Sequence, residues 1–457
     1  MNSPVLDHVE RLDTLKRVSA ELRREPVARR REALRRLVRT IEQYTPELLA
    51  ALEADLGKPA VEAYTSEVGF VLRDLRHAVR LLPRWARARR VRVPLLARPA
   101  SAEYMHEPLG VVLILGPWNY PFQLLFSPLA GALAAGNAVC LKPSEFAPCT
   151  AEVVSRLCAD AFPDGRVQVI TGDQAVSAAL CDLPFDHICF TGSTATGRRV
   201  AAAAAERLVP VTLELGGKSP CVVAPDAPVQ PTVRRIMWGK LMNAGQTCVA
   251  PDYLLLPAGR AGEFRRALIE ETMRWPSTGN HIVNRAHFDR LVALLRGTDV
   301  FCGGKICAQT LMIDPTLVAV SDLAHPLMQD EIFGPILPVL TYDTIEDALE
   351  MIEAHPTPLA AYLFTRDKAL MRDFRHRVVC GGLCINDTLV HIMPADLPFG
   401  GVGASGYGRY RGQAGFETFS NGKAVMRRGT WIDSKLRLPP YRTPLEMLKR
   451  VYRFLLR

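Results

Sequence analysis

The sequence of 457 residues predicts an α/β protein with two or three domains. The apolar run Val111–Leu115 is continuous rather than alternating, as expected of a parallel strand buried on both faces. A strand-like run at Asp186–Phe190 is followed by a glycine turn and a helical segment, an order typical of phosphate-binding folds. Apolar residues at helical spacing between positions 5 and 90 predict helices that form a scaffold.

The remaining elements follow in order along the chain. Residues 102–106 alternate like an exposed strand, and a helix is expected through 130–135. Further strands are expected at 138–141, 360–364 and 382–386, and a helix at 198–207. The segment 397–406 is so rich in glycine that we expect close backbone approach or left-handed turns there.

Composition excludes several classes of function. A hydrophobic fraction of 48% with 23% charged residues is ordinary for a soluble globular protein. The net charge is +9, but most arginines are scattered between acids, so we expect no nucleic-acid binding. The 11 cysteines are odd in number and lack zinc-ligand spacing, which favours a reducing compartment and no metal site. The N-terminus lacks a secretory signal pattern and residues 111–141 are broken by prolines, so a cytoplasmic protein without a spanning helix is expected.

A single cysteine, Cys248, lies among small residues in the stretch 242–252. Small neighbours leave a sulfur accessible, as a nucleophile requires, but most free cysteines are buried hydrophobic residues. A second stretch favours the nucleophile, because Glu214 is a lone carboxylate in an apolar run just before two glycines. Partial burial raises the pKa of such a group towards the range of a general base. The pair therefore indicates a thiol that forms an acyl intermediate and a base that activates water.

Other polar residues follow predicted strands, where ligand sites of α/β sheets lie. Asn119, between two prolines, is either an oxyanion donor or a turn former. Lys142 and Glu145 suit a ribose diol, and the Glu145 carboxylate would repel a 2′-phosphate. The turn from Gly192 through Ser193 to Gly197 suits a phosphate, although it lacks the middle glycine of the usual dinucleotide motif.

The order of these motifs resembles the aldehyde dehydrogenase superfamily over nearly the whole chain. Residues 248–253 and 416–420 are similar to the class 3 branch, the fatty and aromatic aldehyde dehydrogenases. The motifs that carry the resemblance are the Asn119 loop, Lys142–Glu145, Gly192–Gly197, Leu213–Lys218, Gly245–Cys248, Glu331–Pro335 and Leu397–Gly403.

The resemblance implies an aldehyde dehydrogenase-like fold with a Rossmann-type cofactor domain, an α/β catalytic domain and a small bridging sheet. The cofactor domain would comprise residues 1–91 and 112–213, and the catalytic domain residues 214–410. The bridging segment would comprise 92–111 and 411–457, and would support a homodimer.

The resemblance also implies roles for individual residues. Cys248 would be the nucleophile, Glu214 the base and Asn119 an oxyanion donor together with the backbone N–H of Cys248. NAD, or alternatively NADP, would be bound by Lys142, Glu145, Gly192, Ser193, Gly197, Glu331 and Phe333. Glu331, which on its own also fits a surface charge, would contact the nicotinamide ribose, and Phe333 would pack near the ring.

The expected reaction is oxidation of a long-chain aliphatic or aromatic aldehyde to the acid. One alternative is a CoA-acylating enzyme, against which Glu214 argues because such relatives lack this carboxylate. The other is a structural protein of the same fold. The segment 393–396 differs from relatives in a loop that lines the substrate entrance, so the aldehyde itself is not predicted.

The C-terminal segment 444–457 predicts a basic amphipathic helix. Lys449, Arg450, Arg453 and Arg457 share one face, and the apolar residues share the other. Such a helix suits peripheral contact with an anionic membrane. Alternatively, its apolar face docks on the partner subunit or over the substrate entrance.

Overall fold

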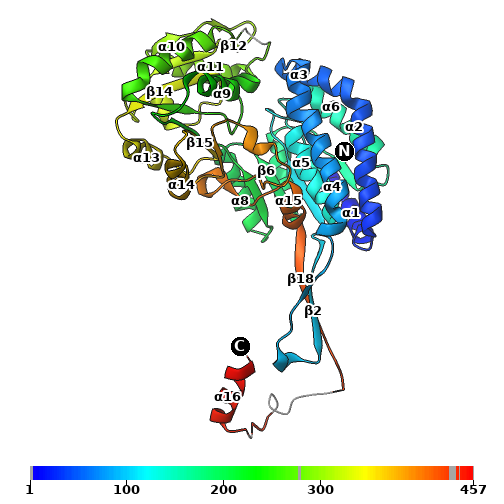
Figure 1. Cartoon of the computed structure of the whole chain (residues 1–457). Coiled ribbons are helices and arrows are strands. Elements are labelled where there is room, and N and C mark those ends of the chain that lie inside the picture. The colour runs from blue at the N-terminus through cyan, green and yellow to red at the C-terminus, as the bar shows by residue number, and fades with distance from the viewer. Residues whose placement is uncertain (1–3, 276–278, 432–438, 442, 456–457) are drawn as a thin grey trace.

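Two parallel sheets and a thin antiparallel arm organise the chain (Figure 1). The computed structural model describes residues 4–275, 279–431, 439–441 and 443–455. One sheet has six strands, in the order β17-β7-β6-β3-β4-β5, and the other has seven, in the order β10-β13-β14-β9-β8-β15-β16. The arm is a three-stranded sheet with the order β1-β2-β18.

In the six-stranded sheet, β3 to β7 are parallel and β17 is antiparallel to β7. The strands between β3 and β7 are apolar and mostly buried, because helices cover the sheet on both faces. The strands are β3 Val111–Leu115, β4 Ala138–Lys142, β5 Val167–Val169, β6 His187–Thr191, β7 Val211–Glu214 and β17 Gly406–Tyr407. The helices between them are α5 Gln123–Ala135, α6 Pro148–Ala161, α7 Gln174–Cys181 and α8 Thr194–Ala205.

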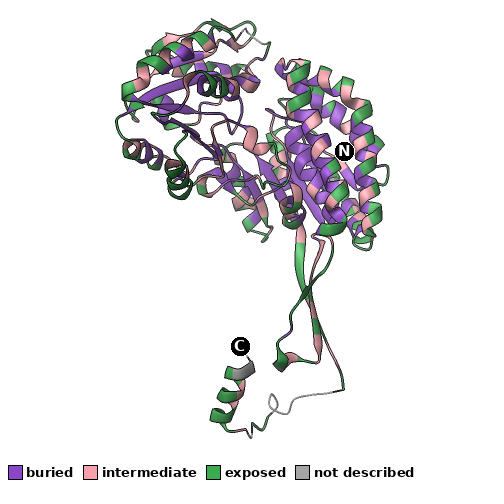
Figure 2. Cartoon of the chain, viewed as in Figure 1, coloured by how far each residue is buried: buried purple, intermediate pink, exposed green. Residues whose placement is uncertain are grey.

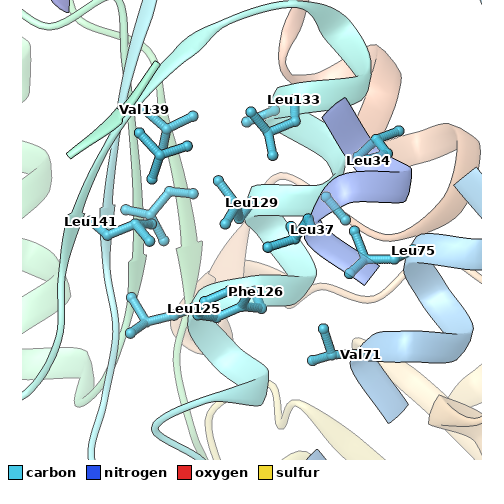
Figure 3. Packing of buried hydrophobic residues seen from close by; sticks show 14 of the residues in the cluster. Leu34, Leu37, Val71, Leu75, Leu125, Phe126, Leu129, Leu133, Val139 and Leu141 are labelled. Carbon is cyan, nitrogen blue, oxygen red and sulfur yellow. The ribbon is translucent and has the colours of Figure 1, made fainter. Parts of the chain in front are cut away.

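The predicted N-terminal scaffold is helical and packs on α5. Figure 3 shows α5 between β4 and the helices that carry Leu34, Leu37, Val71 and Leu75. Because α5 is enclosed by the sheet and these helices, it is apolar nearly all round. The N-terminal elements are α1 Pro4–Leu22, α2 Val27–Leu56, α3 Ala60–Ala63, the π-helical turn η1 Tyr64–Val68 and α4 Gly69–Trp85.

The seven-stranded sheet is parallel apart from β10, which is antiparallel to β13. Its strands are β8 Pro220–Val223, β9 Tyr253–Pro257, β10 Asp299–Cys302, β13 Thr316–Ala319, β14 Ile336–Tyr342, β15 Ala360–Phe364 and β16 Gly382–Ile385. Its helices are α9 Val229–Leu241, α10 Ala261–Thr272, α11 Arg285–Leu294, α12 Pro326–Gln329, α13 Ile345–Glu353 and α14 Lys368–Arg377. A small hairpin pairs β11 Ile306–Cys307 with β12 Met312–Ile313.

Short 3₁₀ turns punctuate the loops. They are η2 Leu95–Ala97, η3 Met242–Gly245, η4 Ala258–Arg260, η5 Val390–Ile392 and η6 Gly403–Ser405.

The arm projects from the body of the molecule (Figure 1). It consists of β1 Arg89–Val91, β2 Ala100–Pro108 and β18 Ser420–Arg428, and most of its side chains are exposed or half-buried (Figure 2). β2 and β18 pair along their whole lengths, from Ser420 opposite Pro108 to Arg428 opposite Ala100. The short helix α15 Gly412–Thr418 precedes β18 and packs on α5.

Three elements cross the domain boundaries expected from the sequence. Gly406–Tyr407 pairs with β7 of the six-stranded sheet, although it belongs to the range expected for the catalytic domain. Arg89–Val91 joins the arm rather than the cofactor domain, and α15 packs on α5 rather than within the bridge. Backbone pairing and packing override sequence position at these edges, and the functional division into domains remains a proposal.

Helix α16, Leu445–Leu455, lies beyond the tip of the arm, far from both large sheets (Figure 1). Leu445 and Met447 are 64% and 58% exposed, so the apolar face is uncovered within the single chain. This arrangement contradicts docking over the substrate entrance of the same chain, because the arm carries the helix away from the body. Arg457, expected on the basic face, lies outside the described residues. Among the helices of the described ranges, none combines the length and apolar character needed to cross a membrane.

Candidate active site

The loop that carries Cys248 is held in an unusual backbone shape. Asn243 and Ala244 adopt left-handed φ angles of 53° and 52°, and Gly245 has a φ of 73°. A Cβ atom on Gly245 would lie 2.2 Å from the carbonyl oxygen of Gly334, so only glycine fits there. The side-chain amide of Gln246 holds the loop in place. Its Oε1 accepts from Val283 N at 3.0 Å, and its Nε2 donates to the Asn243 carbonyl at 3.1 Å. The glycine at 245 and the Gln246 hydrogen bonds therefore hold the backbone before Cys248 in one conformation.

Cys248 is half-buried and lines a mainly apolar pocket of about 200 Å³. Burial raises the pKa of its thiol, and the charges of Glu331 and Glu214 raise it further. The backbone N–H groups of Cys248 and Val249 point at the sulfur and lower its pKa in part. The surroundings thus contain backbone donors that favour the thiolate, but also two carboxylates that oppose thiolate formation.

Glu214 ends β7 and is 1% exposed. Neither of its carboxylate oxygens has a hydrogen-bond partner among the described residues. Burial raises its pKa well above the ordinary value, and the positive charge of Arg409 counteracts this only in part. The glycine-rich segment approaches closely here, as predicted, since a Cβ on Gly400 would lie 3.0 Å from Glu214 Oε1. The Glu214 carboxylate therefore has no hydrogen-bond partner among the described residues and is available to accept a proton. When ionised, it raises the pKa of the Cys248 thiol.

Asn119 is buried against the catalytic loop. Its side-chain Nδ2 donates to the carbonyl oxygen of Gln246 at 3.0 Å, which leaves a second N–H on the same amide. Its own backbone carbonyl accepts from Asn243 Nδ2 and from Lys58 Nζ, each at 2.8 Å. The structure thus brings Asn119 to the loop of Cys248, although Asn119 does not line the apolar pocket.

Behind Asn119 lies a fully buried ion pair whose residues were not expected from the sequence to belong to the site. Lys58 Nζ donates to Glu67 Oε1, and Glu67 Oε2 accepts from the backbone N–H groups of Phe122 and Gln123 at 2.9 and 3.1 Å. Both charged side chains are 0% exposed. The pair ties the loop before α5 to the N-terminal helices. Lys58 and Glu67 are only nine positions apart, but the contacts of Glu67 with Phe122 and Gln123 span 55 and 56 positions, so no local motif indicates the role of the pair.

The pocket that contains Cys248 opens between the two large units. Met393, in the entrance segment singled out from the sequence, lines it, while Asp396 of the same segment pairs with His77 Nε2 at 2.8 Å. The remaining pocket residues are mostly apolar or aromatic, and among them are Phe70, Tyr120, Leu124, Trp238, Met242, Leu389, Ile392, Phe399 and Tyr410.

A second pocket, of about 450 Å³, lies at the carboxyl ends of β3, β4 and β6. It brings together Lys142, Glu145, Gly192 and Ser193, four of the residues expected to bind the cofactor. Lys142 Nζ holds the Glu145 carboxylate at 3.1 Å, so a cation and an anion face the pocket side by side. Ser193 caps α8 by accepting from Thr196 N at 3.3 Å, and the N-terminus of the helix faces the same space. A diol acceptor beside an anion-binding helix end fits the ribose and pyrophosphate of a dinucleotide.

The other expected cofactor residues lie around this pocket rather than on its wall. Gly197 packs on Leu215, where a Cβ would lie 2.5 Å from Leu215 Cδ2, so it sets the approach of α8 to β7. Phe333, with a φ of 54°, contacts the Trp118 ring at a centroid distance of 5.4 Å, and Trp118 lines the pocket.

Glu331 lines neither of these two pockets, but its charge acts on Cys248. A Cβ on Gly216 would lie 2.0 Å from its carboxylate, so the bare glycine backbone makes room for this side chain. Burial raises the pKa of Glu331 to about 8. No cluster of three or more metal-ligating side chains occurs in the described ranges.

A dinucleotide-type pocket on a parallel sheet, next to a second α/β unit that presents a cysteine, defines an oxidoreductase with a thiol at its centre. The aldehyde dehydrogenase family model matches residues 11–425, and the chain belongs to this family. The protein is an NAD(P)-dependent aldehyde dehydrogenase.

Individual relatives support this assignment. The chain is 42% identical over 434 residues to the 4,4'-diaponeurosporen-aldehyde dehydrogenase of Staphylococcus aureus, covering 93% of this chain and 94% of the relative. It is 41% identical over 418 residues to mouse aldehyde dehydrogenase family 3 member A2, covering 90% and 86%, which confirms the resemblance to the class 3 branch.

Solved structures confirm the fold. A substrate-bound state of Staphylococcus aureus AldH superimposes with a TM-score of 0.94 at 39% identity, covering 99% of this chain and all of the other. PnpE in complex with nicotinamide adenine dinucleotide superimposes with a TM-score of 0.88 at 27% identity, covering 96% and 92%.

Proposed function

We propose that the protein oxidises long-chain aliphatic or aromatic aldehydes to carboxylic acids, with Cys248 as nucleophile and water as acyl acceptor. The observation that carries this proposal is the Glu214 carboxylate. It is buried, its oxygens have no hydrogen-bond partner among the described residues, and its charge raises the pKa of the Cys248 thiol. A CoA-acylating enzyme needs no such base, since the CoA thiol itself attacks the acyl group. The apolar lining of the pocket favours an apolar substrate.

Each side chain has a distinct task in this scheme. Cys248 Sγ loses its proton to water and adds to the aldehyde carbon, forming a thiohemiacetal. Loss of a hydride from that carbon would then leave the thioester. The free N–H of the Asn119 amide and the backbone N–H of Cys248 stabilise the oxyanion. Glu214 then takes a proton from the water that cleaves the thioester, and its raised pKa suits this step.

NAD fits the second pocket, with NADP as the alternative. Lys142 and Glu145 would hold the adenosine ribose, Gly192, Ser193 and Gly197 would shape the pyrophosphate site, and Glu331 and Phe333 would contact the nicotinamide end. The chemistry that the cofactor supplies when bound is acceptance of a hydride. The Glu145 carboxylate disfavours a 2′-phosphate by charge repulsion.

A direct assay tests the reaction. NADH formation is measured with a panel of aldehydes, with and without CoA, and with NAD or NADP. We expect turnover without CoA, free acid as the product and a preference for NAD. An acyl-CoA product that forms only with CoA would contradict the proposal that water is the acyl acceptor. A lack of turnover with every aldehyde would contradict the proposed reaction and favour a structural role.

We infer a homodimer in which the arm contacts a second copy. Val91 and Met426 in the arm are 46% and 54% exposed, and β1 and β18 are the outer strands of its sheet in the described part of the chain. Sedimentation equilibrium should give twice the monomer mass. Replacing Met426 by aspartate should weaken the association, and a wild-type monomer at micromolar concentration would contradict the inference.

We also propose that α16 makes peripheral contact with anionic membranes. Its exposed basic residues Lys449, Arg450 and Arg453 suit a negatively charged surface, and its apolar face is free in the single chain. The intact protein should sediment with anionic vesicles at low salt, less so at high salt, and not after deletion of residues 443–457. Failure of the intact protein to sediment would leave docking on the partner subunit as the role of the helix. A cytoplasmic location with this surface contact completes the proposal.

A further inference from the structure

Two arginines face the pocket of Cys248, and they are its only fixed charges among the described residues that line it. They are Arg73 of α4 and Arg411, which precedes α15. The guanidinium carbon of each lies 4.4 Å from the centroid of the same Phe70 ring. A mainly apolar pocket therefore has cationic groups in its wall.

A single carboxylate, Asp74, faces both guanidinium groups. Arg411 is buried and forms a bidentate pair with Asp74, through Nε to Oδ2 at 3.0 Å and Nη2 to Oδ1 at 2.9 Å. Its Nη1 donates to the Ile392 carbonyl. Arg73 reaches the same carboxylate only at 3.5 Å, so two guanidinium groups share a single negative charge. The nearby His391 adds no positive charge at neutral pH, because burial lowers its pKa to about 4.

Arg73 has donors to spare. Its Nε and Nη2 atoms are buried, and Nη2 lies 3.5 Å from Asp74 Oδ1. The side chain as a whole is 38% exposed, so Nη1 is the accessible nitrogen of the guanidinium, and it has no hydrogen-bond partner among the described residues. Burial lowers the pKa of Arg73, the Asp74 carboxylate raises it, and the charge of Arg411 lowers it again. An accessible guanidinium nitrogen without a partner is a strong donor to a carboxylate, since both groups are charged.

We propose that Arg73 binds a carboxylate at the far end of the substrate, so that the preferred substrates are apolar aldehydes with a carboxylate remote from the aldehyde carbon. This proposal rests on the oxidation assigned to Cys248 and specifies its substrate class. The aldehyde carbon gives a hydride to NAD and gains an oxygen from water. One NADH and two protons are released, and the product is a dicarboxylate whose distal carboxylate is unchanged.

The test compares an ω-oxo fatty acid with the unsubstituted alkanal of equal chain length, over several lengths. We expect wild-type kcat/KM to favour the oxo acid by about 10- to 100-fold at the best length, as for a hydrogen-bonded charge pair. The ratio of the two values should fall towards one in Arg73→Leu and be partly restored in Arg73→Lys. Arg76→Leu is the matched control, because Arg76 is an exposed arginine of the same helix that pairs with Glu42.

Equal kcat/KM for the two wild-type substrates, or an unchanged ratio in Arg73→Leu, would overturn the proposal. Alkanal turnover by the wild type tests the oxidation separately, so failure of the specificity can be told apart from failure of the reaction. Calorimetric binding of the dicarboxylate and of the monocarboxylate gives a readout independent of turnover. The dicarboxylate should bind more tightly to the wild type and lose that advantage in Arg73→Leu.

Discussion

Replacing Glu67 by glutamine tests how firmly the segment that carries Asn119 is held. Glu67 uses both carboxylate oxygens as acceptors, Oε1 from Lys58 Nζ and Oε2 from the N–H groups of Phe122 and Gln123. A glutamine has only one acceptor oxygen, so in either orientation its NH₂ group faces another donor. The change also leaves the Lys58 charge buried at 0% exposure without a counter-ion.

The loss of one partner from a buried pair costs about 3–5 kcal/mol. We expect Glu67→Gln to lower the free energy of unfolding by this amount, measured by urea denaturation with linear extrapolation. Turnover should fall as well, because Lys58 supplies one of the two donors to the Asn119 carbonyl.

Two further variants make the test decisive. Glu47→Gln removes one partner of the exposed Glu47–Arg156 pair and should cost at most about 1 kcal/mol. The double variant Lys58→Met/Glu67→Gln should be more stable than Glu67→Gln alone, since no unpaired charge stays buried. A Glu67→Gln protein no less stable than Glu47→Gln, or a double variant less stable than the single one, would refute the reasoning.

The remaining predictions concern the chemistry. Cys248→Ala should abolish aldehyde oxidation while calorimetry still detects NAD binding. More than a few per cent of wild-type turnover would contradict the assignment of Cys248 as the nucleophile. Glu214→Gln should slow deacylation by roughly 10²–10⁴-fold and sharpen a pre-steady-state burst of NADH; equal slowing of acylation would exclude a specific deacylation role. Because burial raises the pKa of Glu214, its basic form grows as pH rises, so wild-type kcat should increase from neutral to alkaline pH and Glu214→Gln should lose that increase. Asn119→Ala should lower kcat by on the order of 10²–10³-fold, and near-normal turnover would make it a turn former.

Much of the fold follows from local sequence patterns. The runs at Val111–Leu115 and Ala360–Phe364 coincide with β3 and β15, because strands buried on both faces are continuously apolar. The helix expected at 130–135 is longer in the structure, since α5 begins at Gln123 and contains Pro128 in its interior. Enclosure of α5 between the sheet and the N-terminal helices outweighs the low helix propensity of proline there.

The candidate site was only partly predictable. Lys142, Glu145 and Ser193 follow strands of one parallel sheet, so their convergence on one pocket could be inferred from strand order. The roles of Lys58 and Arg73 could not, because each depends on a partner brought close by long-range packing. The pair between Arg411 and Asp74, which leaves Arg73 short of a counter-ion, joins residues 337 positions apart.

The pairing of β2 with β18 has a consequence for synthesis of the chain on the ribosome. Residues 100–108 emerge more than 300 residues before their partners at 420–428. At typical elongation rates this interval lasts about 15–60 s. During that time only the short strand Arg89–Val91 is at hand to pair with β2, which leaves its other edge open to a second nascent chain. When ribosomes follow one another closely on one messenger RNA, the open edges of β2 in neighbouring nascent chains are therefore brought close enough to pair with each other. Slow synthesis of residues 420–428 lengthens the time during which this edge is open.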